Sequence, residues 1–354
     1  MDEKIIGEAK KTTEDAVAAE WQVGDVILDL YEVTGILGEG GMGKVYKVHH
    51  KGWKVDLAVK SPRPDIFTQA TGKENFVREA ETWVNLGLHP HIVSCYYVRT
   101  LGGIPRVFAE YVEGGSLADW IRSRKLYEGG PKKALERILD IAIQFAWGLQ
   151  YAHEQGLVHQ DVKPDNVMMT TGGTVKVADF GLSKARGRAG EKYVPGSGRS
   201  ILVSAGWMSP PYCSPEQHLG ELLSHRTDIW SWGVSVLEMF CGELNVCEGR
   251  GNLAAVKLEG FLETEDKSGE IPPMPEALAA LLRRCFQRDP VARPRDMLEI
   301  ASELQKIYRQ TTRSTYHREA PKAVDLKADG LSNRAVSFLD LGKKRMPSGV
   351  GRKP

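Results

Sequence analysis

The chain has 354 residues, of which 42% are hydrophobic and 26% are charged. This composition is typical of a folded globular protein and excludes a largely disordered or fibrous chain, while the length allows two domains or one domain of two lobes. A formal net charge of +1 gives no overall attraction to nucleic acid or to an anionic membrane, so neither is predicted as a partner.

The N-terminal part of the chain is polar and lacks the apolar core of a signal peptide. No uninterrupted apolar run in the chain reaches about 18 residues, and the five cysteines form no C-x-x-C pair. We therefore predict a cytoplasmic protein without a disulfide framework or a zinc site. Residues 1–30 are predicted to be an extension, because residues 2–20 favour helix but have too thin an apolar face for a core helix.

Short strands with alternating apolar residues follow from Tyr31. The pattern predicts strands at 31–37, 44–48, 57–60, 92–98 and 107–111. A helix at 74–86 interrupts them, since Phe76, Ala80 and Trp83 fall on one helical face.

The pattern becomes helical after Gly114-Gly115, with predicted helices at 134–154, 228–240 and 276–286. A sheet-rich lobe followed by a helix-rich lobe indicates the α+β class. From Arg309 to Pro354 the chain holds 11 Lys and Arg against 4 Asp and Glu, so residues 309–354 are predicted to be a basic tail.

Gly38-Glu39-Gly40-Gly41-Met42-Gly43 fits the pattern G-x-G-x-x-G. The same pattern occurs in dinucleotide-binding folds and in purely structural turns. A dinucleotide loop opens into a helix, whereas strands are predicted on both sides of this one. We therefore interpret it as a hairpin whose backbone approaches a triphosphate, with Val45 as an apolar surface for the base.

Lys60 ends the apolar strand Leu57-Ala58-Val59-Lys60. It is either a surface lysine or an ammonium group that pairs with nucleotide phosphates and is held by a carboxylate. Glu79, at the margin of the apolar face of the 74–86 helix, is the candidate carboxylate, although an isolated glutamate is more often simply solvated.

The run His159 to Asn166 is followed by Asp179-Phe180-Gly181 after a short apolar strand. Asn166 and Asp179 offer the oxygen ligands that Mg²⁺ prefers. Asp161 is placed to accept the proton of a substrate hydroxyl, and Lys163 to offset charge on a transferred phosphoryl group. Each residue alone is also a common turn residue, but their joint order is hard to obtain by chance.

With these motifs in this order, the sequence resembles the eukaryotic-type protein serine/threonine kinases, most closely the cytoplasmic bacterial members, over residues 31–308. The matching segments are Gly38 to Gly43, Ala58-Val59-Lys60, Glu79, His89 to Val93, Ala109 to Leu117, His159 to Asn166, Asp179-Phe180-Gly181, Ser214-Pro215-Glu216, Asp228 to Gly233 and Arg288 to Pro294.

The resemblance implies a bilobal protein-kinase fold, with a small antiparallel-sheet N-lobe at about 31–112 that holds one key helix, and a larger, mainly helical C-lobe at about 116–308. It implies ATP and Mg²⁺ as cofactors and a protein substrate with a Ser or Thr acceptor, with autophosphorylation as a further expectation. The implied catalytic residues are Asp161 and Lys163, and the implied Mg²⁺ ligands are Asn166 and Asp179. The implied ATP contacts are Leu37, Gly38, Gly40, Gly43, Val45, Ala58, Lys60, Glu79 and Glu110.

The resemblance also implies three further features. Lys163 is the serine/threonine hallmark, Ser209 occupies the position of a hydroxyl that contacts the catalytic Asp, and Glu216 pairs with Arg293. Two residues depart from the family pattern. Gln160 replaces the usual arginine that binds a phosphate on the activation segment, so activity is predicted not to require that phosphate. Ala109 stands where the family usually has a larger side chain beside the adenine pocket.

The segment 328–342 resembles the first helix of a tetratricopeptide repeat, as in repeat-fused bacterial kinases; a lone amphipathic tail helix is the alternative. Two other functions remain open as alternatives to the kinase. A pseudokinase scaffold that binds ATP and a protein partner would commonly lack the equivalents of Lys60, Asp161 or Asp179, all present here. A small-molecule phosphotransferase would not need Ser209 and Ser214-Pro215-Glu216, which belong to a protein-substrate platform.

Overall fold

The computed structural model describes residues 14–40, 43–63, 76, 80, 83–180, 209–242, 253–264 and 269–321. These residues fall into two compact units, which are treated separately. The first contains residues up to Leu88 together with Ser94–Tyr111, and the second contains His89–Val93 and Val112–Pro321. Among the described residues, no helix combines the length and the apolar character needed to cross a membrane.

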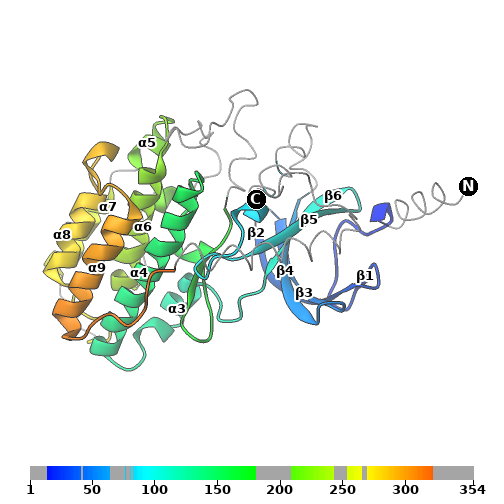
Figure 1. The fold of residues 1–354 in the computed structure, drawn as a ribbon, viewed down its shortest axis with the longest axis horizontal. Helices are drawn as coiled ribbons and strands as arrows, with labels where there is room; N and C mark the ends of the chain where they lie inside the picture. Colours follow the sequence, from blue (N-terminus) through cyan, green and yellow to red (C-terminus); the bar gives the residue numbers. More distant parts are fainter. Residues whose placement is uncertain are drawn as a thin grey trace, which may run out of the picture. The chain divides into compact units, whose positions relative to one another are not determined.

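The first unit is built on one antiparallel sheet with the strand order β1-β2-β3-β4-β6-β5 (Figure 1). The strands are β1 (Val26–Ile27), β2 (Tyr31–Gly40), β3 (Gly43–His50), β4 (Val55–Pro62), β5 (Cys95–Leu101) and β6 (Ile104–Glu110). The described residues of the predicted 74–86 helix are helical, and Phe76, Ala80 and Trp83 are buried as expected.

One predicted strand, 92–98, has the wrong bounds. The strand β5 begins only at Cys95, because Ile92 and Val93 pair instead with Val177 in the second unit. A continuous apolar run does not reveal which neighbour its backbone will bond, so the sequence pattern merged two segments that the fold separates.

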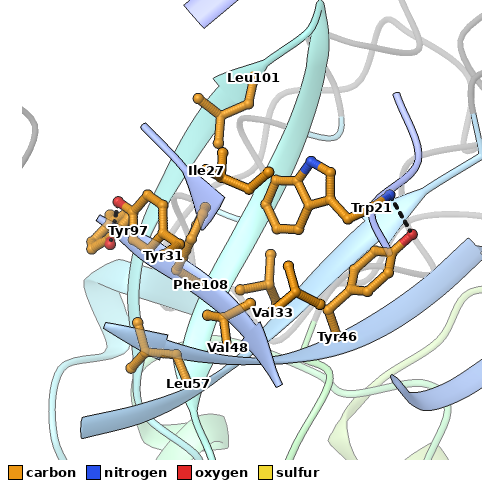
Figure 2. Close-up of a cluster of buried hydrophobic side chains, with 11 residues drawn as sticks. Trp21, Ile27, Tyr31, Val33, Tyr46, Val48, Leu57, Tyr97, Leu101 and Phe108 are labelled. Atoms are coloured by element: carbon orange, nitrogen blue, oxygen red, sulfur yellow. Dashed lines mark hydrogen bonds between the residues drawn. The ribbon is translucent and has the colours of Figure 1, made fainter. Parts of the chain in front are cut away.

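Chain preceding Tyr31 contributes to the sheet and to its core, which was not expected of the extension. Val26–Ile27 adds a short strand to β2, and Trp21 is fully buried in a cluster with Ile27, Tyr46 and Phe108 (Figure 2). Residues 1–13 lie outside the described part of the chain.

The second unit is mainly helical. Its helices are α3 (Leu117–Arg122), α4 (Pro131–Glu154), α5 (Pro215–His218), α6 (His225–Cys241), α7 (Leu253–Glu263), α8 (Glu276–Cys285) and α9 (Met297–Thr312). Helix α4 packs against α6 and α9 (Figure 1) and against β8 (Val175–Val177), which forms a small hairpin with β7 (Val167–Met169). The predicted α+β class, with an antiparallel-sheet lobe and a helical lobe, is confirmed.

The helical unit includes residues from the predicted tail. Helix α9 extends to Thr312, and the hydroxyl of Tyr316 and the guanidinium of Arg318 both donate to Asp140 on α4, at 2.7 and 2.8 Å. The tetratricopeptide-like segment 328–342 lies outside the described residues, so that prediction stays a prediction.

Candidate active site

One face of the sheet gathers the side chains predicted to contact a nucleotide. Strands β3 and β4 pair Val45 with Lys60 and Lys47 with Ala58, and β6 pairs Ala109 with Ala58. Paired residues share a face, and successive residues alternate between faces. Val45, Ala58, Lys60 and Ala109 therefore lie on the same side of the sheet.

The glycine-rich hairpin joins β2 to β3 at one end of this face. A Cβ atom at Gly38 or Gly40 would meet no protein atom within 4 Å, so the backbone there is open to a phosphate group. Gly43 has φ +136°, and a Cβ atom there would overlap the carbonyl of Ser61. Only glycine fits this third position. Leu37 lies in the irregular part of the β2–β3 register and is 44% exposed.

Two other predicted ATP contacts, Lys60 and Glu110, lie in described strands. Lys60 lies in β4, but its predicted partner Glu79 is outside the described residues. Glu110 ends β6, where its backbone N–H donates to the carbonyl of Ser94 and its carboxylate accepts from the Ser94 N–H at 3.1 Å.

In the helical unit, Asp161 is the centre of a hydrogen-bonded group. Lys163 Nζ lies 2.8 Å from Asp161 Oδ2 and donates to Ser209 Oγ at 2.6 Å. Ser209 Oγ in turn donates to Asp161 Oδ1 at 3.0 Å. Both carboxylate oxygens are thus oriented by neighbours, and the contact between Ser209 and Asp161 that the resemblance implied is present.

Asn166 ends the 3₁₀ turn Pro164–Asn166, which brings its amide back to Asp161. Its Nδ2 donates to the Asp161 carbonyl at 2.8 Å and to Asp161 Oδ2 at 3.1 Å, which leaves the amide oxygen to ligate a cation. The Ala178 N–H donates to the Asn166 carbonyl at 2.8 Å, so the chain reaches Asp179 beside this turn. Asp179 has φ +63°, an uncommon backbone conformation that clusters at functional sites.

A buried carboxylate, Asp228 on α6, holds the backbone before Asp161. It accepts from the N–H groups of His159 and Gln160 and from Nε2 of His153, each at 2.8 Å. Burial opposes its ionisation, but these donors outweigh burial and hold the pKa of Asp228 below its usual 3.8. Sequence reasoning matched Asp228 to a family segment without giving it this role; an Asp among the apolar residues of a helix was the available signal.

His159 links this backbone to the segment around Asp179. Its Nε2 is 2.7 Å from the carbonyl of Ala178, and its ring lies 4.7 Å from the buried ring of Phe180. The Asp161 loop and the start of the Asp179 segment are therefore packed as one piece of structure.

The implied ion pair between Glu216 and Arg293 is confirmed. The two guanidinium NH groups donate to the two carboxylate oxygens at 2.7 Å each, and both side chains are buried. Burial alone would raise the pKa of Glu216, but Arg293 and the Thr227 hydroxyl hold it below its usual 4.5.

Gln160, which departs from the family pattern, has φ +68° and a side chain that is only 5% exposed. Within the described part of the chain, neither its Oε1 nor its Nε2 has a hydrogen-bond partner, while its carbonyl accepts from Gln217 Nε2 at 2.8 Å. A neutral amide therefore occupies this buried position, where the family usually has a guanidinium group.

Comparison with known proteins agrees with this geometry. Residues 31–307 match the family model described as "Protein kinase domain". The chain belongs to the protein kinase family.

Three relatives illustrate the likeness of this chain to bacterial proteins. It is 36% identical over 59% of its length to a probable serine/threonine-protein kinase of Streptomyces coelicolor, and 32% identical over 80% to one of Clostridium perfringens. It is 35% identical over 61% to the serine/threonine-protein kinase PknB of Mycobacterium tuberculosis. The matches span 30%, 39% and 33% of these three relatives' own lengths, respectively.

Proposed function

We propose that this kinase transfers the γ-phosphoryl group of ATP to Ser and Thr hydroxyls of protein substrates. The observation that carries the proposal is the group formed by Asp161, Lys163 and Ser209, in which both carboxylate oxygens of Asp161 are oriented. A carboxylate held in this way beside a protein-substrate platform suits the positioning of an acceptor hydroxyl.

In the proposed reaction Asp161 orients the acceptor hydroxyl and accepts its proton as the new O–P bond forms. Lys163, at 2.8 Å from Asp161, offsets negative charge on the transferred group. Lys60, held by the Glu79 carboxylate, pairs with the α and β phosphates, and the open backbone at Gly38 and Gly40 covers them.

The adenine site in this proposal is formed by Leu37, Val45, Ala58 and Glu110. Val45 and Ala58 supply an apolar surface on the same sheet face as Lys60. This arrangement supports a nucleotide whose base lies on apolar side chains and whose phosphates extend toward the glycine-rich hairpin.

Protein kinases use Mg²⁺ with ATP, and the donors here fit that ion. An amide oxygen at Asn166 and a carboxylate at Asp179 are the hard ligands that Mg²⁺ takes alongside phosphates and water. When bound, Mg²⁺ neutralises charge that develops on the phosphates. Asn166 is prepared for this role because its amide nitrogen is already engaged with Asp161.

The proposal is tested by incubating the purified chain with labelled ATP, Mg²⁺ and casein. Label recovered as phosphoserine or phosphothreonine supports it, whereas label on tyrosine alone contradicts the residue preference. The alternative, a pseudokinase scaffold, predicts ATP binding without transfer. Autophosphorylation and a cytoplasmic location remain predictions.

Phosphorylation of the activation segment, between Asp179 and Glu216, is not expected to control activity; residues 181–208 of this segment lie outside the described residues. Because Gln160 carries no charge, it cannot pair with a phosphate as an arginine does. Treatment with a phosphatase, with removal of phosphate verified by mass spectrometry, should leave kcat unchanged. A loss of turnover after this treatment would show that another basic group senses the phosphate.

Ala109 is expected to admit bulky ATP-site inhibitors. It faces the same side of the sheet as Ala58 and Lys60, so two small side chains lie next to each other across β4 and β6. In Ala109→Phe the added ring should raise the Kd of such inhibitors about tenfold or more relative to ATP, since overpacking costs about 1–3 kcal/mol. Ala109→Ser is the matched small control, and equal inhibition of both variants would contradict the prediction.

A further inference from the structure

The chain before the family domain is attached to the sheet by several kinds of contact. Glu14 accepts from the Arg99 guanidinium at 2.8 Å, and its carbonyl accepts from the Gly102 N–H at 2.8 Å. Trp21 is fully buried, and its backbone N–H donates to the Tyr46 hydroxyl (Figure 2). We call residues 14–25 the N-terminal strap.

The β5–β6 turn is shaped to receive this strap. Gly102 has φ +58°, and a Cβ atom there would overlap the carbonyl of Val17. A side chain at this position would therefore be strained and would also push the strap away. The close approach indicates a specific docking site.

Arg106 on β6 is the main receptor for the strap. Its guanidinium is buried and donates to the carbonyls of Ala18, Ala19 and Leu101, and it lies 4.4 Å from the Trp21 ring. Among the described residues none of its partners is a carboxylate. Burial accordingly lowers the pKa of Arg106 to about 10. Without the strap this buried cation would lose two of its three carbonyl acceptors.

Arg106 also connects the strap to the phosphate-binding end of the sheet. Its Nε donates to Ser61 Oγ at 3.0 Å, and Ser61 directly follows Lys60 on β4. Ser61 pairs across the sheet with Lys44, and Gly43 pairs with the next residue, Pro62. The strap therefore acts on the backbone that carries Lys60 and the third glycine of the hairpin.

A second contact reaches the hairpin directly. Glu20 on the strap lies 3.2 Å from Lys44 Nζ, and Lys44 stands between Gly43 and Val45. Because neighbours in a strand alternate, Lys44 and Tyr46 point to the strap side while Val45 points to the opposite face. The strap thus contacts one face of β3, and the opposite face of β3 is the one proposed to receive ATP.

We propose that the N-terminal strap positions the phosphate-binding end of the sheet, with Arg106, Trp21 and Glu20 as positioning residues. The inference rests on the proposed ATP site. It goes beyond the family domain, since the residues that dock lie before Tyr31, where the family match begins.

The test reverses the charge of Glu20, which is exposed, so Glu20→Lys is expected to fold. We expect the KM for ATP to rise roughly two- to fivefold, the effect of losing an exposed ion pair and adding repulsion, with no change in the KM for the protein acceptor. The double variant Glu20→Lys/Lys44→Glu should bring the ATP KM back toward the wild-type value, short of it because Lys44 also pairs with Glu39 at 3.8 Å. If Glu20→Lys only made the protein fold less well, the amount of active enzyme would fall and both KM values would stay unchanged.

Glu259→Lys is the matched control, because it reverses an exposed carboxylate that pairs with Arg283 at 2.8 Å in the helical unit. It should leave the ATP KM unchanged. The proposal is overturned if Glu20→Lys keeps the wild-type ATP KM, raises both KM values equally, or is not rescued by the swap.

Calorimetric titration of Mg-ATP into the same four proteins separates this proposal from the proposed function. If the wild type binds ATP but transfers no phosphate, the proposed kinase activity is contradicted. The proposed role of the strap is still tested by the Kd values. A Kd for Mg-ATP that is equal in Glu20→Lys and in the wild type overturns the proposed role of the strap.

Discussion

Asp161→Asn is expected to lower kcat for acceptor phosphorylation by about 10²–10⁴-fold, the range found for loss of a positioned acid or base. The asparagine amide cannot accept the proton of the acceptor hydroxyl. It also removes the charge that Lys163 faces at 2.8 Å and alters the oxygen to which Ser209 donates. The measurement is steady-state transfer from labelled ATP to casein, with thermal melting to verify that the variant is folded.

Asp165→Asn is the matched control for this variant. Asp165 lies in the 3₁₀ turn Pro164–Asn166, four residues after Asp161, and its side chain is 52% exposed with Arg122 at 3.6 Å. The same chemical change there should leave kcat close to that of the wild type. Equal kcat values for the two variants would remove Asp161 from the mechanism.

Arg293→Met is expected to destabilise the protein by about 3–5 kcal/mol, because breaking a buried ion pair leaves the other charge uncompensated. Glu216 would lose two donors at 2.7 Å and keep the Thr227 hydroxyl at 2.9 Å together with a backbone N–H. Urea unfolding measures the effect. The double variant Glu216→Leu/Arg293→Met should be more stable than Arg293→Met, since no buried charge remains; a double variant that is less stable would contradict this account.

The same pair predicts a dependence of stability on pH. Because the pKa of Glu216 is lower in the folded protein than its usual 4.5, the contribution of Glu216 to the free energy of unfolding is fully present above about pH 4.5. It is lost as the pH falls through the lower, folded-state pKa. Between pH 5 and pH 3 the free energy of unfolding of the wild type should therefore fall more steeply than that of the double variant.

Much of the candidate site was predictable because its parts are close in sequence. Asp161, Lys163 and Asn166 lie within six residues, so one short turn brings them together, and their order alone suggested the chemistry. Val45, Ala58 and Lys60 were predictable for a related reason. Alternation along two neighbouring strands is enough to put them on a common face.

Other features needed contacts between distant parts of the chain. Arg106 was not singled out in the sequence, because an arginine in a strand is normally solvated, and two of the acceptors of its buried guanidinium, the carbonyls of Ala18 and Ala19, lie 88 and 87 residues away. Asp228 is separated from Gln160 by 68 residues, so its hydrogen bond from the Gln160 N–H, just before Asp161, is seen only in the folded structure.

The family and the α+β class could be predicted from the sequence alone, since they depend on local order and periodicity, and the residues of the proposed chemistry were proposed from the same local order. Only the folded structure shows that Trp21 belongs to the core cluster and β1 to the sheet, that β5 starts at Cys95, and that Gln160 is a buried amide. The physical reason is the same in each case. Burial and hydrogen-bond partners are fixed by segments that meet only after folding, and no local pattern records which segments those will be.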